Sequence, residues 1–81
     1  MYVRAYIRSR GNPAEITKLD LSEKNLTHLD EDAFENLTQL KELSLAENQL
    51  TSLPPKIFEK LTQLKKLYLG GNENFIHLFS E

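Results

Sequence analysis

The sequence ITKLDLSEKNLTHLDEDAFENLTQ, residues 16–39, is followed by LKELSLAENQLTSLPPKIFEKLTQ, residues 40–63, and then by LKKLYLGGN, residues 64–72. The three segments begin 24 residues apart and share apolar residues at their first, fourth and sixth positions. These residues are Ile16, Leu19, Leu21, Leu40, Leu43, Leu45, Leu64, Leu67 and Leu69. A fixed period of this length predicts a repeat architecture in which each unit packs against its neighbours.

The fourth to sixth positions of each repeat alternate between apolar and polar residues. In the first repeat, Leu19 and Leu21 alternate with Lys18 and Asp20. Because successive side chains of a strand point to opposite faces, this pattern predicts a short strand with one buried face in every repeat. We expect the strands to be parallel, with equivalent residues of the three repeats stacked in columns.

Asn48 and Asn72 follow the predicted strands of the second and third repeats, where the chain changes direction. An amide side chain both donates and accepts hydrogen bonds, so each is expected to satisfy backbone groups inside the stack. The matching residue of the first repeat is Lys24, so the row of buried amides is expected to begin at Asn48. Matching apolar residues of the first two repeats fill the other side of the stack: Leu26, Leu29, Phe34 and Leu37, then Leu50, Leu53, Phe58 and Leu61.

The second repeat matches the signature L-x-x-L-x-L-x-x-N-x-L without a substitution, so the chain resembles the leucine-rich repeat family. The segments AFENLTQL and IFEKLTQL are similar to the 24-residue subtype found in Toll-like receptor ectodomains, in jawless-vertebrate variable lymphocyte receptors and in many bacterial proteins. The resemblance covers residues 16–72. It implies an α/β fold, a short right-handed solenoid with parallel strands on its concave face and loops or helical turns on its convex face. It also implies noncovalent protein binding through the concave face.

Residues 1–15 precede the repeats and are expected to cap the exposed end of the first one. Four of their residues share one face of a helix: Val3, Tyr6, Ile7 and Arg10. The Gly-Asn-Pro sequence at residues 11–13 is a helix stop signal, which favours a short helix over Tyr2–Ser9. Apolar residues also alternate between residues 3 and 7, so a strand stays open as the less favoured alternative.

The amino-acid composition narrows the classes of protein to which the chain can belong. The chain has 81 residues, a net charge of −2 and no cysteine, which suits a single domain and demands neither a nucleic acid nor a membrane partner. The absence of cysteine and of a signal-peptide core favours a cytoplasmic location or an engineered fragment. Arg4, Arg8 and Arg10 are interpreted as a solvated face of the amino-terminal segment.

No enzyme, cofactor or metal site is predicted. His28 and His77 are isolated, and the sequence has no cysteine nucleophile, zinc-ligand spacing or GxSxG elbow. The three acids at residues 30–32 lack the spaced ligands and central glycine of an EF-hand. They are interpreted as capping a helical turn in the segment that follows.

The candidate binding residues flank the inward-facing leucines of the predicted sheet. They are Lys18, Asp20, Lys41, Glu42, Ser44, Lys65, Lys66 and Tyr68. Tyrosine often anchors interfaces because it buries a large area with little loss of rotamer freedom, so we expect a protein-binding hot spot centred on Tyr68. Two alternatives stay open: the column of Lys18, Glu42 and Lys66 has a purely structural role, and Tyr68 is exposed without a partner.

The third repeat departs from the pattern after Asn72, because Asn74 occupies the place of Leu26 and Leu50. Five apolar residues form a candidate self-association surface: Leu64, Leu67, Leu69, Phe75 and Phe79. Either the FIHLF segment, residues 75–79, folds back as a cap of a complete monomer, or the terminal turn docks against another copy or further sequence. The second option is favoured. It defines the alternative function, a structural fragment, capping piece or designed module that self-associates as a homo-oligomer.

Overall fold

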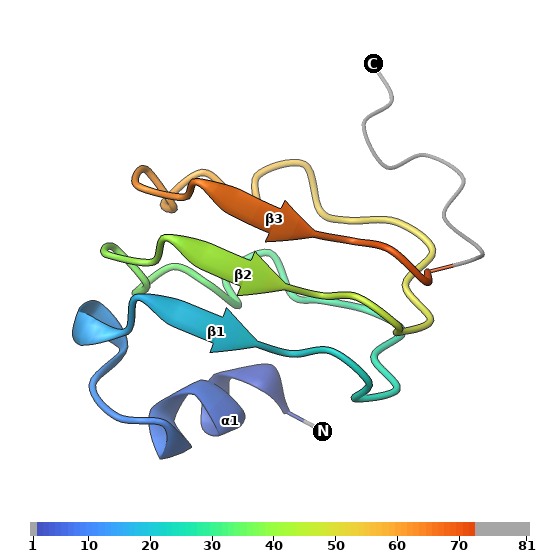
Figure 1. The fold of residues 1–81 in the computed structure, drawn as a ribbon, viewed down its shortest axis with the longest axis horizontal. Helices are drawn as coiled ribbons and strands as arrows, with labels where there is room; N and C mark the ends of the chain where they lie inside the picture. The colour runs from blue at the N-terminus through green and yellow to red at the C-terminus, as the bar shows by residue number, and fades with distance from the viewer. Residues whose placement is uncertain (1, 73–81) are drawn as a thin grey trace.

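The computed structural model describes residues 2–72 and contains one short helix and one sheet (Figure 1). The sheet consists of β1 (Lys18–Asp20), β2 (Glu42–Ser44) and β3 (Lys66–Tyr68), which are parallel and lie in the order β1-β2-β3. Helix α1 (Val3–Ser9) lies beside β1, and the 3-10 helix η1 (Pro13–Glu15) leads from it towards the sheet (Figure 1). The predicted strands and their parallel arrangement are confirmed.

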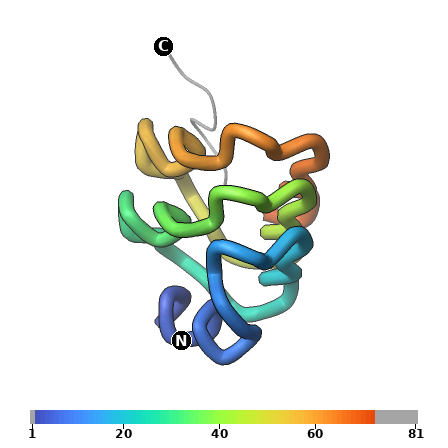
Figure 2. Tube along the Cα trace, turned by 90° about the vertical axis from the view of Figure 1, so that its left-hand side faces the viewer, coloured from blue at the N-terminus to red at the C-terminus, as the bar shows by residue number. Residues whose placement is uncertain are grey.

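The strands are paired between equivalent positions of the repeats. Leu19 pairs with Leu43, and Leu43 pairs with Leu67. The same register places Lys18, Glu42 and Lys66 in one column and Asp20, Ser44 and Tyr68 in the next, as the sequence predicts. Figure 2 shows that the chain after β1, and again after β2, returns to the start of the next strand one level along the stack.

The core lies between the sheet and these return segments. Leu40, Leu43 and Leu45 of the second repeat are fully buried, and Phe34 from the first return segment packs in the same cluster. Burial of such a side chain contributes roughly 1.5–3 kcal/mol, so the repeated leucines supply most of the driving force for folding. The equivalent residues of the third repeat are only partly buried: Leu64, Leu67 and Leu69.

The amino-terminal segment, for which helix and strand were both open, forms a helix. It begins at Val3, one residue later than predicted, with Tyr2 as its N-cap. Val3 and Ile7 are one helical turn apart and are both buried in the core cluster. A helix this short is marginal alone, so its apolar face must be stabilised by packing on the repeats. Gly11 follows with a φ of 126°, a conformation that glycine adopts without a steric penalty.

The return segments are built from successive turns, and no α-helix other than α1 occurs in residues 2–72. In the first return segment the Ala33 amide donates to the Asp30 carbonyl and the Glu35 amide donates to the Asp32 carbonyl. None of the acidic side chains at residues 30–32 accepts a hydrogen bond from a backbone amide within the described residues. A capping hydrogen bond from these side chains is therefore not formed within residues 2–72, while the predicted interaction of their charges with the turn stays a prediction.

Several predictions concern residues that the structure does not describe. His77, Phe75, Phe79 and the alternative placements of the FIHLF segment all lie outside the described residues. The division into a cap of residues 1–15 and repeats of residues 16–39, 40–63 and 64–81 stays a prediction.

Candidate functional site

Asn48 fixes the carboxyl ends of β1 and β2 relative to each other. Its Oδ1 atom accepts hydrogen bonds from the amides of Lys24 (2.9 Å) and Leu26 (3.0 Å). Its Nδ2 atom donates to the carbonyls of Leu21 (2.9 Å) and Leu45 (3.0 Å). One buried side chain thus satisfies backbone groups of two repeats, as the sequence predicts.

Asn72 performs the same role one repeat further along. Its Oδ1 atom accepts from the Leu50 amide (3.1 Å), and its Nδ2 atom donates to the carbonyls of Leu45 and Leu69, both at 2.9 Å. The row of buried amides begins at Asn48, as predicted. Because it holds the strand ends in place, it also fixes the positions of the side chains that leave the exposed face of the sheet.

Lys24, which stands in the asparagine position of the first repeat, contacts helix α1 instead. Its Nζ atom lies 5.2 Å from the centre of the Tyr6 ring, and Arg10 Cζ lies 5.9 Å from the same centre. Both distances allow a cation–π attraction. Within residues 2–72 no strand precedes β1, so an asparagine at this position would have no earlier strand to bond. A lysine at this position contacts the helix instead.

The exposed face of the sheet carries an open hollow of about 340 Å³ between helix α1 and β3. Five of the candidate residues line it: Lys18, Asp20, Glu42, Ser44 and Tyr68. The Tyr68 side chain is prominent there, because 49% of the residue is exposed although tyrosine is a large, partly apolar residue. The other three candidates, Lys41, Lys65 and Lys66, are exposed but do not line the hollow.

Tyr6 and Arg10 also line the hollow and were not predicted as site residues. The sequence placed them on the helical face of Val3 and Ile7, and Arg10 was interpreted as part of a solvated face. One sequence signal could have identified them as site residues: a tyrosine and an arginine lie beside the apolar residues of a helix that caps the repeats. Such residues bury their apolar part and keep a polar group in water, so they reach past the helix to the neighbouring surface.

The acidic groups of the hollow already have partners. Glu42 Oε2 lies 3.7 Å from Lys18 Nζ. One oxygen of Asp20 accepts hydrogen bonds from the Ser22 hydroxyl (2.6 Å) and the Ser22 amide (2.9 Å). These two bonds, and then the positive charge of Lys24, hold the pKa of the Asp20 carboxyl below its ordinary value.

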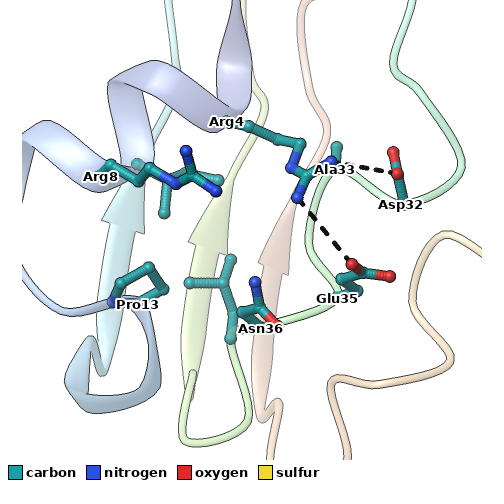
Figure 3. Close-up of a pocket in the computed structure, with 9 residues that line it drawn as sticks. Arg4, Arg8, Pro13, Asp32, Ala33, Glu35 and Asn36 are labelled. Carbon is teal, nitrogen blue, oxygen red and sulfur yellow. Dashed lines mark hydrogen bonds and ion pairs between the residues drawn. The ribbon is translucent and has the colours of Figure 1, made fainter.

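A second, smaller space lies on the other side of α1, between the helix and the first return segment (Figure 3). Arg4 reaches across it, with Nη1 at 3.2 Å from Asp32 Oδ2 and Nη2 at 4.0 Å from Glu35 Oε1. Arg4, which was predicted to lie on a solvated face, is partly exposed and also ties the helix to the repeats. The space measures about 20 Å³, which holds little more than one water molecule, so we interpret it as a packing gap.

Residues 2–72 contain no cluster of three or more histidine, cysteine, aspartate or glutamate side chains suited to a metal ion. No helix among them is long and apolar enough to cross a bilayer.

A comparison with protein families agrees with this repeat structure. A family model described as Leucine rich repeat matches residues 14–73, which is more than half of the chain. No curated protein sequence matches the chain. Domains of this family generally mediate protein–protein interactions and are typically not enzymes. The chain therefore belongs to the leucine-rich repeat family.

Proposed function

We propose that this chain is a noncovalent protein-binding module whose partner docks on the exposed face of the sheet. The hollow of about 340 Å³ carries this proposal, because it lies between two tyrosines, Tyr6 and Tyr68, that belong to opposite ends of the described structure. A side chain inserted there contacts α1 and all three strands. Aromatic residues in a partly enclosed depression are typical of interface hot spots.

The polar residues of the hollow suit a protein ligand. Lys18, Glu42, Asp20 and Ser44 offer positive, negative and neutral hydrogen-bonding groups around the two tyrosines. A small apolar site fixes the orientation of its ligand through a few polar groups inside the site. Other polar groups, at the rim of the interface, discriminate between partners. In this proposal Tyr68 supplies most of the affinity and the charged residues supply specificity.

The proposal includes the wider architecture. We place the binding face on the concave side of a short right-handed solenoid, because one strand per repeat and an in-register parallel sheet support that shape. A cytoplasmic location is part of the same proposal and is supported by the cysteine-free sequence.

The test is a selection of binding peptides from a displayed random library on the full chain, followed by NMR mapping of the amides that the best peptide perturbs. We expect the perturbed amides to lie in β1, β2, β3 and the exposed side of α1. Tyr68→Ala should weaken binding at least tenfold, as expected for the removal of a hot-spot residue. Tyr2→Ala is the matched control, since Tyr2 is 60% exposed and does not line the hollow.

Two results contradict the proposal. The first is a set of perturbed amides confined to the return segments, and the second is equal affinity of the native chain and the Tyr68→Ala variant. A fall in affinity for Tyr2→Ala equal to that for Tyr68→Ala would indicate a general effect of losing an exposed ring.

A second candidate function, self-association through the third repeat, is favoured by the partial burial of its leucines. Leu64, Leu67 and Leu69 occupy the positions that are fully buried in the second repeat, and β3 is the last strand within residues 2–72. Docking of a second copy against this repeat would complete their burial. Sedimentation over a concentration series tests it, with a dimer that Leu67→Lys dissociates as the expected result and a monomer at every concentration as the contradicting one.

A further inference from the structure

Positive charge is concentrated where the three strands begin. The residues at the starts of the strands are Thr17, Lys18, Lys41, Glu42, Lys65 and Lys66. Four lysines and one glutamate give a formal charge of 4 − 1 = +3 at this edge, in a chain whose net charge is −2. All four lysines are exposed, so the sheet face has a strongly basic border.

Three of these lysines are neighbours across β2 and β3, and we call them the lysine edge: Lys41, Lys65 and Lys66. The Lys41 carbonyl accepts hydrogen bonds from the Lys65 amide (2.8 Å) and the Lys66 amide (3.1 Å), which fixes their backbones side by side. Like charges on adjacent strands are destabilising. An anionic group bound between them would remove this repulsion.

The nearby acids do not neutralise the lysine edge. Glu42 lies between Lys18 and Lys66 in its column, yet its carboxylate pairs with Lys18. Within residues 2–72, no ion pair involves Lys41, Lys65 or Lys66. Among the described residues, the charges of Lys41, Lys65 and Lys66 are therefore not neutralised by an ion pair.

The lysine edge and the hollow are close enough to bind one ligand segment. Lys66 and Tyr68 are two residues apart on β3 and point to the same face. This spacing corresponds to roughly 6–7 Å along the strand. Alternate side chains of an extended peptide are separated by the same distance, so one peptide can present an acid to Lys66 and an apolar residue to Tyr68.

We infer that the partner docks an acidic protein segment on this face, with carboxylates against the lysine edge and one large apolar or aromatic side chain seated in the hollow beside Tyr68. This inference rests on the proposed function and specifies the chemistry of the partner. A nucleic acid fits less well, because Asp20 and Glu42 lie in the hollow and would repel a phosphate backbone.

The experiment uses the full chain and peptides selected from a displayed random library. The double variant Lys65→Glu/Lys66→Glu reverses two charges of the lysine edge. Its matched control is Lys56→Glu/Lys60→Glu, which makes the same change in charge at exposed lysines that line a different depression, in the return segment after β2. Circular dichroism melting curves establish that both variants remain folded.

Peptides selected on the native chain should be enriched in aspartate and glutamate, with one large apolar residue two positions from an acid. Lys65→Glu/Lys66→Glu should weaken their binding about tenfold or more, since attraction becomes repulsion at two positions. A several-fold increase in salt concentration should weaken it as well. The control variant should retain affinity within about twofold, as expected for charges distant from the contact.

Three results overturn the inference: selected peptides without an excess of acids, equal losses for both charge-reversal variants, or tighter binding of single-stranded oligonucleotides than of the selected peptides. Its failure is distinguishable from failure of the proposed function. Selected peptides could bind the sheet face and require Tyr68 without being enriched in acids. This result would overturn only the inference that the partner is acidic. Peptides that bind elsewhere, or the recovery of no binding peptide, count against both.

Discussion

The second and third repeats place leucines at the same three positions but bury them to different extents. Leu40, Leu43 and Leu45 have no exposed surface, whereas the corresponding residues of the third repeat are only partly buried. The sequence pattern is the same in both, so it cannot cause the difference. Burial in a stacked repeat depends on neighbours on both sides, and the second repeat has a strand on each side of β2.

The first repeat is also at an end of the sheet, yet Leu21 is fully buried and Leu19 is 5% exposed. Helix α1 explains this, because Val3 and Ile7 pack into the same core cluster. A short amphipathic helix therefore covers Leu19 and Leu21, whereas Ile16, the equivalent of Leu40, stays partly buried. Four experiments test the difference between a covered repeat and the third repeat.

The largest difference is expected between Leu43→Ala and Leu67→Ala, which remove the same atoms from paired positions of β2 and β3. Leu43 is fully buried, so its loss should lower the free energy of unfolding by about 3–4 kcal/mol. Leu67 is partly buried and should cost roughly 1–2 kcal/mol. Urea denaturation of the two variants measures both values, and equal losses would mean that the third repeat is as well covered as the second.

The next largest effect is expected for the buried amides. Asn48→Ala removes five hydrogen bonds to backbone groups, and Asn72→Ala removes three within the described residues. Because unpaired buried groups are costly, we expect losses of about 3 kcal/mol and about 2 kcal/mol respectively. Amide hydrogen exchange should show faster exchange of Leu26 in the first variant and of Leu50 in the second. Unchanged exchange at Leu26 in the Asn48→Ala chain would contradict the assigned role of this side chain.

A smaller effect is expected at the turn that follows each strand. Glu47 and Gly71 occupy equivalent places with φ values of 57° and 79°, and a Cβ atom added at Gly71 would collide with the Glu47 side chain. Gly71→Ala should therefore lower the free energy of unfolding by about 1–2 kcal/mol. Glu47→Gly should raise it by about 0.5 kcal/mol, because relief of the left-handed conformation exceeds the entropy cost of glycine. Thermal unfolding tests both signs, and destabilisation by Glu47→Gly would show that the carboxylate is needed.

The smallest effect is the pH dependence of stability that arises from Asp20 in the first repeat. The lowered pKa of Asp20 means that its ionised form stabilises the folded state above the ordinary carboxyl pKa, and that this contribution disappears as the pH falls through the lowered value. Below about pH 4 the free energy of unfolding of the native chain should therefore fall by a few tenths of a kcal/mol relative to that of Asp20→Asn. The effect is small because Asp20 is exposed and solvent weakens the interaction. Parallel urea titrations over this range measure the difference. A constant difference between the two chains would contradict the coupling to Ser22.

Much of the candidate site follows from the repeat. Equal spacing places Asp20, Ser44 and Tyr68 in one column because each strand has the same register with the next. Tyr6 and Arg10 could not be placed in this way, because they lie on a helix whose position over the sheet depends on packing and not on the period. The role of Arg4 was missed for a similar reason, since its partner Asp32 is 28 residues away in the sequence.

Three features could be predicted from the 24-residue period: the three parallel strands, their register and the two buried asparagines. Each of them recurs along the chain, so each copy supports the interpretation of the others. Three other features come from the tertiary packing: the amino-terminal segment forms a helix, Lys24 contacts Tyr6, and a hollow forms between α1 and β3. These features occur once each and depend on contacts between segments distant in the sequence. A local pattern is compatible with several such contacts, and packing selects one of them.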